Sequence, residues 1–446
     1  MPTLFITGSK DKYYLHGLHK HLVIVLLASY FISLHMKQTL QAILLKPRSL
    51  LVIYIATAVI ASVQLILLGT HAVTMPLAAD IKMQSQQAQS TILQVTEYNN
   101  YIIFKRSFFH LLAGKNLYDI FPYEQWDYYK YSPTFSLFMG FLAYLPDIIG
   151  LSIWNILNAL TVFMAIRLLP YTVKTQCLIL LFAALELLTS MQNAQSNGLM
   201  CGLMIAAYGC MQRNKAIWAT LWLVLATYIK VYGAVGFCLF LFYPGKPRFI
   251  LYAIFWTVIM AILPLLVTPF HTLIWQYQNW VVLMKADAIA SYGISVSGWL
   301  HSWFGIEAKT YITIAGLLLF LLPFARFRLY RNEVYKMLML ASMLIWVIIF
   351  NHKAESPTYV IAVAGVAIWY FAMPPTVWRR SLFWLTFIFT SLATTDIFPP
   401  YVRIHYLVPY TIKAVPCIIV WCAVLIDMLR LKQNEQLFNT QAHQPA

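Results

Sequence analysis

Long uninterrupted apolar runs are the feature that most limits how this chain can fold. The first strong run extends from about Leu50 to Leu68, and similar runs recur almost to the end of the chain. A helix that crosses a bilayer needs roughly 20 apolar residues. These runs are continuous rather than alternating, which argues against a transmembrane β-barrel. Only 10% of the residues are charged, against roughly 25% in soluble domains. The sequence therefore predicts an all-α polytopic integral membrane protein.

The apolar runs predict a bundle of about 12 transmembrane helices, with one long polar stretch, 71–130, after the first span. We interpret residues 48–430 as one transmembrane domain, residues 431–446 as a polar cytoplasmic tail and residues 1–47 as an N-terminal extension. The predicted helices lie near residues 50–68, 131–145, 148–168, 177–188, 199–211, 217–242, 249–267, 311–324, 337–350, 359–371, 382–392 and 408–429.

The N-terminal extension contains a weaker apolar run, His21–His35, which is short and flanked by histidines. We expect an interfacial helix there, because no small-residue cleavage site follows it as it would in a secretory signal peptide. Alternatively, Met36 is the natural start of the protein. In either case we expect Met1–Met36 to be dispensable for membrane insertion.

The excess of basic residues predicts the orientation of the helices. The chain has 31 Lys and Arg against 15 Asp and Glu, a formal net charge of +16. In a chain this apolar, basic loops mark the cytoplasmic side and meet anionic lipid, so we expect membrane lipids and no nucleic acid as partners. We expect the protein to lie in the cell inner (plasma) membrane, with the stretch 71–130 outside the cytoplasm. The basic clusters are Lys46/Arg48, Lys246/Arg248, Arg326/Arg328/Arg331/Lys336, Arg379/Arg380 and Arg430/Lys432.

The middle of the chain allows two arrangements. If every apolar run spans the membrane, the basic residues near 167–174 and 213–215 lie outside. If the run 131–145 dips without crossing and the run around Lys230 is re-entrant, the same basic residues lie inside with the other clusters. The sequence does not decide between the two.

Motifs for nucleotide, zinc or disulfide chemistry are absent from the sequence. It has no Gly-rich phosphate loop and no HExxH motif. Its six cysteines lie in or beside apolar runs, and no CxxC occurs. We expect no bound cofactor and no protein metal ligands, and we leave open whether a reaction here needs a divalent metal.

The stretch 71–130 contains an amphipathic segment that begins near Glu97. On a 3.6-residue period its aromatic side chains share one face, while Asn99, Arg106 and His110 fall on the opposite face. That pattern is typical of a helix in the membrane interface. We expect Asn100, Arg106 and His110 to contact a substrate, although packing on the bundle explains each of them equally well.

Asp127 and Lys130 stand at the entrance of the next apolar run, just before Pro133. Proline suits the first turn of a helix. A lysine beside a membrane can hold a phosphate, and a carboxylate near it can act as a general base. Asp127 is therefore a predicted catalytic carboxylate, and Lys130 is a predicted substrate ligand.

Three further places supply candidate binding residues. The outer loop Asn351–Pro357 contains His352, Lys353 and Glu355, and it is either a solvated hairpin turn or a second wall of the same site. Lys230 lies inside an apolar run. An ionisable residue there is a functional candidate by default; alternatively, its side chain snorkels to the membrane surface. Arg403 lies in the last outer loop.

Several short motifs together resemble one family. They are Gly114-Lys-Asn-Leu-Tyr-Asp119, Tyr129-Lys-Tyr-Ser-Pro133, Asn193-Ala-Gln-Ser-Asn-Gly-Leu199, Ile229-Lys-Val-Tyr232 and Ser295-Val-Ser-Gly-Trp-Leu300. Over roughly Leu50–Leu429 the chain resembles the family-87 glycosyltransferases of the GT-C superfamily, and in particular Bacteroidetes-type members. The resemblance implies a GT-C-type bundle whose large first extracytoplasmic loop carries interfacial helices. It also implies a polyprenyl-phosphate sugar as donor.

Two positions depart from the family pattern. The family usually has an aspartate, taken as the catalytic base, at the position that Asn100 occupies here, and an amide side chain cannot accept that proton. The family also usually has a glycine immediately before Gln195, where this chain has Ala194. The carboxylate nearest to this position is Glu97, one helical turn earlier, so the resemblance makes Glu97 a second predicted catalytic carboxylate beside Asp127. It leaves open whether the base has moved to one of these residues or the activity differs from that of the family.

Two functions remain as hypotheses. The first is an inverting hexosyltransferase that moves a sugar from a polyprenyl phosphate to an envelope glycan or glycolipid on the periplasmic or exterior side. The second is a polytopic transporter or flippase of a lipid-linked or small anionic substrate. Transporters usually show internal repeats and broken helices near the membrane midplane. No repeat is evident here, and the polar residues gather at one surface, which favours the enzyme.

Overall fold

Helices make up nearly all of the structure, a computed structural model that describes residues 44–75, 91–287 and 291–438. The N-terminal extension up to residue 43, including its predicted interfacial helix, lies outside the described residues. The predicted all-α architecture is confirmed except for one β-hairpin directly after the first long helix. Its strands β1 (Thr70–Met75) and β2 (Thr91–Thr96) pair antiparallel, with Thr70 opposite Thr96.

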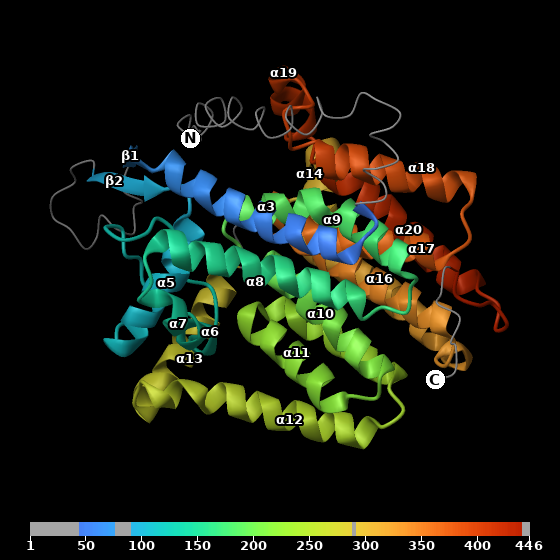
Figure 1. Cartoon of the computed structure of the whole chain (residues 1–446), viewed down its shortest axis with the longest axis horizontal. Helices are drawn as coiled ribbons and strands as arrows, with labels where there is room; N and C mark the ends of the chain where they lie inside the picture. Colours follow the sequence, from blue (N-terminus) through green and yellow to red (C-terminus); the bar gives the residue numbers. More distant parts are fainter. Residues whose placement is uncertain (1–43, 76–90, 288–290, 439–446) are drawn as a thin grey trace.

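The helices form one elongated bundle in which many axes run nearly side by side (Figure 1). In chain order they are α3 (Pro47–Leu68), α5 (Asn99–Leu112), α6 (Pro133–Phe138), α7 (Gly140–Ala143), α8 (Asp147–Arg167), α9 (Val173–Gln192), α10 (Asn197–Gln212), α11 (Ala216–Ile229), η2 (Val231–Phe242), α12 (Lys246–Ile262), η3 (Leu263–Leu266), α13 (Phe270–Asp287), α14 (Val296–Phe304), α15 (Lys309–Leu321), η4 (Leu322–Ala325), η5 (Phe327–Leu329), α16 (Glu333–Ile349), η6 (Ser356–Thr358), α17 (Tyr359–Ala372), α18 (Val377–Thr386), η7 (Phe387–Leu392), α19 (Pro400–Val402), η8 (Arg403–Leu407), η9 (Ile412–Ala414) and α20 (Val415–Arg430).

Within the described ranges, five helical segments are long and apolar enough to cross a membrane. They are Pro47–Leu68, Asp147–Arg167, Val173–Gln192, Lys246–Leu266 and Ile412–Arg430. Shorter apolar helices such as Ala216–Ile229 and Ser356–Ala372 lie among them. The chain is therefore a membrane protein, and the total of about 12 crossings stays a prediction.

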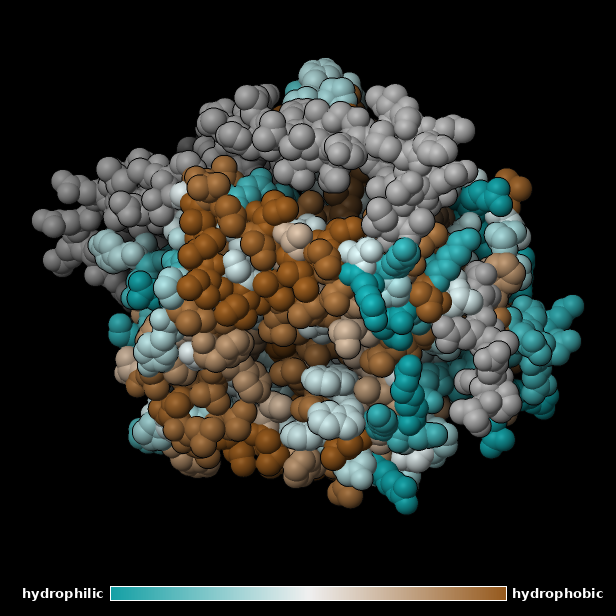
Figure 2. Space-filling view, viewed as in Figure 1, coloured by the Kyte–Doolittle hydropathy of each residue, from teal (hydrophilic) through white to brown (hydrophobic). Residues whose placement is uncertain are grey.

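The outer surface of the bundle carries exposed apolar side chains, for example along α12. Along α12, Leu251, Ile254 and Val258 are each more than half exposed, and brown side chains cover much of the face in Figure 2. Such a surface is unfavourable in water. It is the expected surface of a helix that faces acyl chains.

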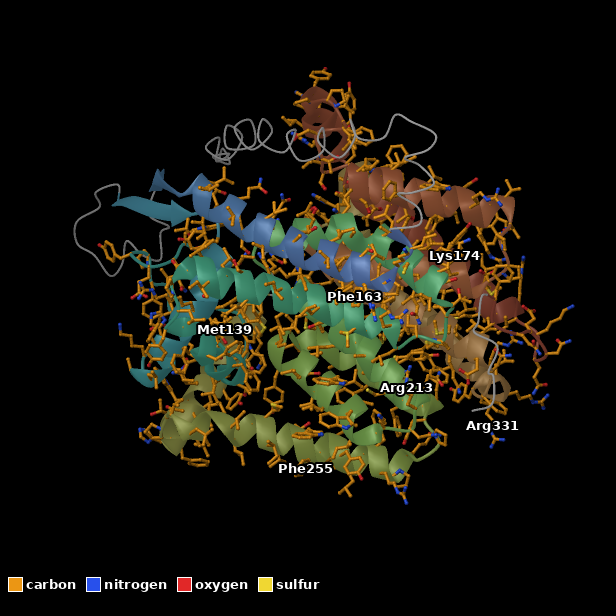
Figure 3. The ribbon with its side chains drawn as sticks, viewed as in Figure 1. Met139, Phe163, Lys174, Arg213, Phe255 and Arg331 are labelled. Atoms are coloured by element: carbon orange, nitrogen blue, oxygen red, sulfur yellow. The ribbon has the colours of Figure 1, made fainter. Side chains whose placement is uncertain are left out.

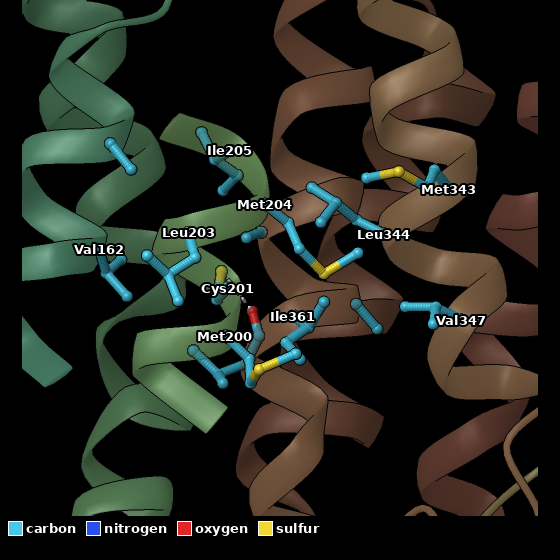
Figure 4. Close-up of a cluster of buried hydrophobic side chains, with 14 of the residues drawn as sticks. Val162, Met200, Cys201, Leu203, Met204, Ile205, Met343, Leu344, Val347 and Ile361 are labelled. Carbon is cyan, nitrogen blue, oxygen red and sulfur yellow. Dashed lines mark hydrogen bonds between the residues drawn. The ribbon is translucent and has the colours of Figure 1, made fainter. Parts of the chain in front are cut away.

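The core lies where α10, α16 and α17 pack together beside α8. Met200 and Met204 of α10 meet Leu344 of α16 and Ile361 of α17 (Figure 4), and all four side chains are fully buried. The Cys201 thiol of α10 donates to the carbonyl of Val360, with Sγ and O 3.8 Å apart. This packing fixes the first turns of α10 and α17 relative to each other, and those turns carry the site described below.

One end of the bundle, here called the basic end, collects positively charged residues. The Arg213 guanidinium donates to the Leu168 carbonyl at 2.6 Å, and Arg326 donates to the Leu429 carbonyl at 2.7 Å. Arg379 forms a buried ion pair with Asp427, also at 2.7 Å. Lys174, Arg213 and Arg331 lie toward this end in Figure 3, whereas Met139 lies toward the opposite end.

The predicted run 131–145 does not form a helix that could span a bilayer. Its two helices, α6 and α7, have six and four residues, so each is at most about 9 Å long, against roughly 30 Å of hydrocarbon. This observation agrees with the sequence alternative in which the segment dips without crossing.

The run 217–242 breaks at Lys230 into two helices that fold back on each other. An added Cβ at Gly233 of η2 would lie 2.6 Å from the backbone of Ala226 in α11. At the other end of the pair, the Tyr243 hydroxyl donates to the Asn214 carbonyl at 3.4 Å. The two helices therefore form an antiparallel hairpin with Lys230 at its tip, and the residues near 213–215 and 246–248 lie at the same end.

The close approach at Gly233 gives a test of this hairpin. We expect Gly233→Val to lower the free energy of unfolding by about 1–3 kcal/mol, because the new side chain overlaps the α11 backbone. Ala234→Val, on the exposed side of the same helix, should change it by less than about 0.5 kcal/mol. Thermal unfolding of both purified variants in detergent is the measurement. Equal melting temperatures for the two would contradict the hairpin.

Candidate functional site

The site is built around the Lys230 side chain at the tip of the α11–η2 hairpin. Its Nζ donates to Asn197 Oδ1 at 2.7 Å, and the Tyr232 hydroxyl donates to the same oxygen at 3.4 Å. The Asn197 amide in turn donates to Gln195 Oε1. Gln195 Nε2 then donates to Glu355 Oε2 at 2.7 Å. One continuous chain of hydrogen bonds thus joins a lysine to a solvent-exposed carboxylate.

The turn between α9 and α10 holds Gln195 and Asn197 in place. Its backbone is left-handed at Ala194, with φ of 50°, and the Gln195 N–H closes the turn on the Ser190 carbonyl at 3.1 Å. The Trp154 indole donates to the Ala194 carbonyl at 3.0 Å. The Asn100 amide donates to the Asn193 carbonyl at 2.9 Å. The predicted substrate ligand Asn100 therefore supports the turn that presents Gln195.

Asp127 and Lys130 border the same site. Lys130 Nζ lies 3.3 Å from an Asp127 carboxylate oxygen, and these side chains are 34% and 42% exposed. The Lys130 carbonyl accepts from the Trp280 indole at 3.3 Å. Both charged groups are thus paired with each other and partly exposed to solvent.

Tyr131, the residue after Lys130, contacts Lys230. Lys230 Nζ is 5.8 Å from the centre of the Tyr131 ring, within the range of a cation–π contact. Burial raises the pKa of the Tyr131 phenol, and the nearby charges of Glu355 and Asp127 raise it further. Asp127 and Glu355 therefore approach one tyrosine from two separate parts of the chain. Tyr131 stays neutral at physiological pH.

The loop that carries Glu355 packs on the loop that precedes α14. The Ile294 N–H donates to the Ala354 carbonyl at 2.7 Å, and the Ser291 hydroxyl donates to the His352 carbonyl at 2.8 Å. Gly293 has φ of 57°, and a Cβ there would meet the His352 carbonyl at 2.5 Å. His352 and Lys353 thus lie in a loop fixed by its backbone, three and two residues before Glu355.

Other predicted ligands form separate clusters. His110 stacks on Phe121, with ring centres 3.8 Å apart, and its Nε2 lies 3.0 Å from a Glu124 oxygen. Arg106 Nε lies 3.7 Å from the same oxygen. Burial lowers the pKa of His110, and Glu124 only partly opposes this effect. The two side chains predicted on the polar face of α5 are therefore brought together around Glu124.

Arg403 belongs to a separate ion pair, and Glu97 lies just before α5. Arg403 pairs with Asp396 at 2.7 Å, and both side chains are largely buried. Glu97 lies in the turn between β2 and α5, two residues before Asn99. Over the described ranges, no three His, Cys, Asp or Glu side chains gather as metal ligands would.

Sequence reasoning missed the central roles of Gln195, Asn197 and Tyr232. The motif 193–199 was noted only as a family feature, although polar side chains at the start of an apolar helix are a signal in themselves. The ion pair between Glu186 and Lys413 was also not predicted from the sequence. These residues are 227 positions apart, and Lys413 Nζ lies 2.8 Å from Glu186 Oε1.

One protein-family model matches half of the chain. The family described as glycosyltransferase family 87 matches residues 129–351, a segment that includes Lys130, the turn at Gln195 and Lys230. The chain belongs to glycosyltransferase family 87 and is a membrane glycosyltransferase. No curated protein matches the chain significantly.

The left-handed backbone at Ala194 explains why a glycine suits this position, and it can be tested. Ala194→Gly should keep the free energy of unfolding within about 1 kcal/mol, because relief of the strained φ offsets the lost buried methyl group. Ala194→Val should lower it by about 2 kcal/mol or more, since a β-branched side chain is a steric outlier there. Thermal unfolding measures both, and a valine variant as stable as the glycine variant would contradict the turn geometry.

Proposed function

We propose that the protein transfers a hexose from a polyprenyl-phosphate donor to a hydroxyl group of an envelope glycan or glycolipid, on the extracytoplasmic side of the inner membrane. One observation carries the proposal. Lys230 lies against the Tyr131 ring and is joined through Asn197 and Gln195 to Glu355, while the Asp127–Lys130 pair directly precedes Tyr131 in the chain. That set supplies cations for a phosphate and carboxylates for a hydroxyl. No observation on the described residues favours the transporter or flippase.

The hairpin at Lys230 supports this sidedness. If α11 and η2 each cross, and α6 and α7 do not, the described residues make twelve crossings, and the basic residues near 167–174 and 213–215 join the other basic clusters on one side. The crossings are α3, α8, α9, α10, α11, η2, α12, α15, α16, α17, α18 with η7, and α20. The positive-inside rule then puts the basic end in the cytoplasm and Lys230 outside.

An extracytoplasmic site favours a lipid-linked donor. Nucleotide sugars are made in the cytoplasm, whereas a polyprenyl phosphate carries its sugar across the membrane and stays in the bilayer. Its phosphate needs a cation at the membrane surface, and Lys230 and Lys130 are close enough for their charges to interact. Two ammonium groups can stabilise the charge that develops on the departing phosphate, so no strong acid is needed.

The transfer step balances with one base. The acceptor oxygen attacks the anomeric carbon as the bond from that carbon to the phosphate oxygen breaks, and the bonding pair leaves with the phosphate. The acceptor proton passes to a carboxylate. We assign this role to Asp127, because it lies beside Lys130 and is accessible. Glu97, one helical turn from the family aspartate position, is the rival candidate.

Amide variants separate these two carboxylates. We expect Asp127→Asn to lower kcat by about 10²–10⁴-fold, because a general base contributes that much. Glu97→Gln should keep activity near that of the wild type. Asp119→Asn is the matched control. Asp119 is an exposed acidic residue of the same region, and its side chain accepts a hydrogen bond from the Asn116 amide at 2.7 Å. The opposite ranking would assign the base to Glu97, and full activity of both variants would exclude an outer-loop base.

The direct test of the function is incubation of the purified protein with labelled polyprenyl-phosphate hexoses and extracted envelope lipids. The proposal requires label to move into a larger glycan or glycolipid and polyprenyl phosphate to be released. Lys230→Met should abolish this transfer while retaining the fold. Absence of transfer from every polyprenyl-phosphate hexose tested by the wild-type protein would overturn the proposed donor.

The sidedness has its own test in intact cells. Tyr123 is 88% exposed, so Tyr123→Cys should react with a membrane-impermeant maleimide before the cells are permeabilised. Lys432→Cys, beyond the end of α20 at the basic end, should react only after permeabilisation. The parent chain controls for its own exposed Cys422. If Lys432→Cys alone reacts in intact cells, the topology is the reverse of the proposed one, and the site is not extracytoplasmic.

A further inference from the structure

A buried ion pair lies next to the site but outside its chemistry. Lys413 Nζ, at the start of the segment η9–α20, lies 2.8 and 3.0 Å from the two carboxylate oxygens of Glu186 in α9. The two side chains are 5% and 0% exposed. The third proton of the ammonium group is donated to Ser356 Oγ at 2.9 Å. Lys413 Nζ also lies 5.4 Å from the centre of the Tyr359 ring.

These contacts leave Lys413 with no capacity to bind a substrate. An ammonium group has three protons, and all three hydrogen-bond positions are taken. Burial of a charged pair costs desolvation energy that mutual attraction repays only with good geometry, so such a pair is weak evidence for stability alone. Ionisable residues inside helical membrane domains usually have a function. The function of this pair must therefore act through the groups that it holds.

Ser356 is the group that links the pair to the site. It directly follows Glu355, and the preceding residue, Ala354, is buried and bonded through its carbonyl to Ile294. With both neighbours fixed, the Glu355 carboxylate is exposed to solvent yet held in reach of Gln195 Nε2 at 2.7 Å. From Gln195 the hydrogen bonds continue through Asn197 to Lys230.

We propose that the Glu186–Lys413 pair is a positioning device for Lys230, the ammonium group that receives the phosphate of the donor. The pair fixes Ser356, and Ser356 fixes the Glu355 carboxylate. Glu355 then orients the Gln195 amide, which sets the Asn197 oxygen that accepts from Lys230. This inference rests on the proposed function for the nature of the ligand. The geometric linkage itself concerns only residues of the described chain.

The Arg379–Asp427 pair offers a matched control. It also joins two helices, at 2.7 Å with side chains 11% and 8% exposed, but it lies at the basic end. The two double variants are Glu186→Gln/Lys413→Met and Arg379→Met/Asp427→Asn. Each removes both charges at once, so neither leaves an unpaired buried charge that would unfold the protein. Lys413→Arg keeps the charge and serves as the conservative variant.

The first measurement is independent of any donor. It follows the rate at which an amine-reactive reagent modifies Lys230, by mass spectrometry of the folded protein. Loss of the Glu186–Lys413 pair should release Lys230 from Asn197 and raise this rate severalfold, whereas the control pair should leave it unchanged. An unchanged rate in Glu186→Gln/Lys413→Met, or an equal rise in the control, would overturn the positioning role.

The second measurement is the KM for a polyprenyl-phosphate hexose. We expect Glu186→Gln/Lys413→Met to raise it by roughly 10- to 100-fold, because small displacements of a positioned group have effects of this size. Lys413→Arg should recover most of the loss, and the control pair should keep the wild-type KM. A wild-type KM in the first double variant would overturn the inference. A wild-type protein that uses no such donor would instead overturn the proposed function, while the labelling result would still decide the linkage.

Discussion

The hydrogen bond from Lys230 to Asn197 is the interaction on which the rest of the site depends. A lysine inside an apolar run is costly unless its charge is satisfied, and here the chain turns at that residue so that the ammonium group leaves the helix–helix contact. The turn requires close backbone packing, which Gly233 permits. The helix starts at Asn197 and Ser356 then bring amide and carboxylate groups toward the same charge. Groups at separate helix starts thus belong to one hydrogen-bond chain that ends at this charge.

The sequence indicates single candidate residues better than the contacts among them. Local chemistry points to Asp127, Lys130, Lys230 and Glu355 one by one, and the structure pairs Asp127 with Lys130 and joins Glu355 to Lys230 through two amides. The central amides of Gln195 and Asn197 were not assigned a role, because an amide in a polar turn has many uses and only its partners reveal this one. Partners far apart in sequence, such as Glu186 and Lys413, leave no periodic pattern that a single sequence can show.

The fold shows the same limit. Continuous apolar runs correctly predicted a helical membrane protein, since length and composition determine what can cross a bilayer. They could not show that the run 217–242 is two helices, because both arms of a hairpin are equally apolar and the turn is a single residue. Nor could they show that 131–145 forms only the short helices α6 and α7. Where a helix ends inside an apolar run depends on tertiary contacts, such as the one between the Ser132 hydroxyl and the Tyr228 carbonyl at 2.5 Å.

The contacts of Asn100 suggest what the asparagine does where the family pattern has an aspartate. An aspartate there would place a carboxylate against the Asn193 carbonyl, where Asn100 now donates a hydrogen bond at 2.9 Å. The amide therefore strengthens the turn that presents Gln195, and a carboxylate could do so only if protonated. With asparagine at position 100, the chain lacks a proton acceptor there but gains a hydrogen bond that holds the turn. Such an exchange is compatible with transfer only if another carboxylate accepts the proton, and Asp127 is accessible beside a lysine on the same site.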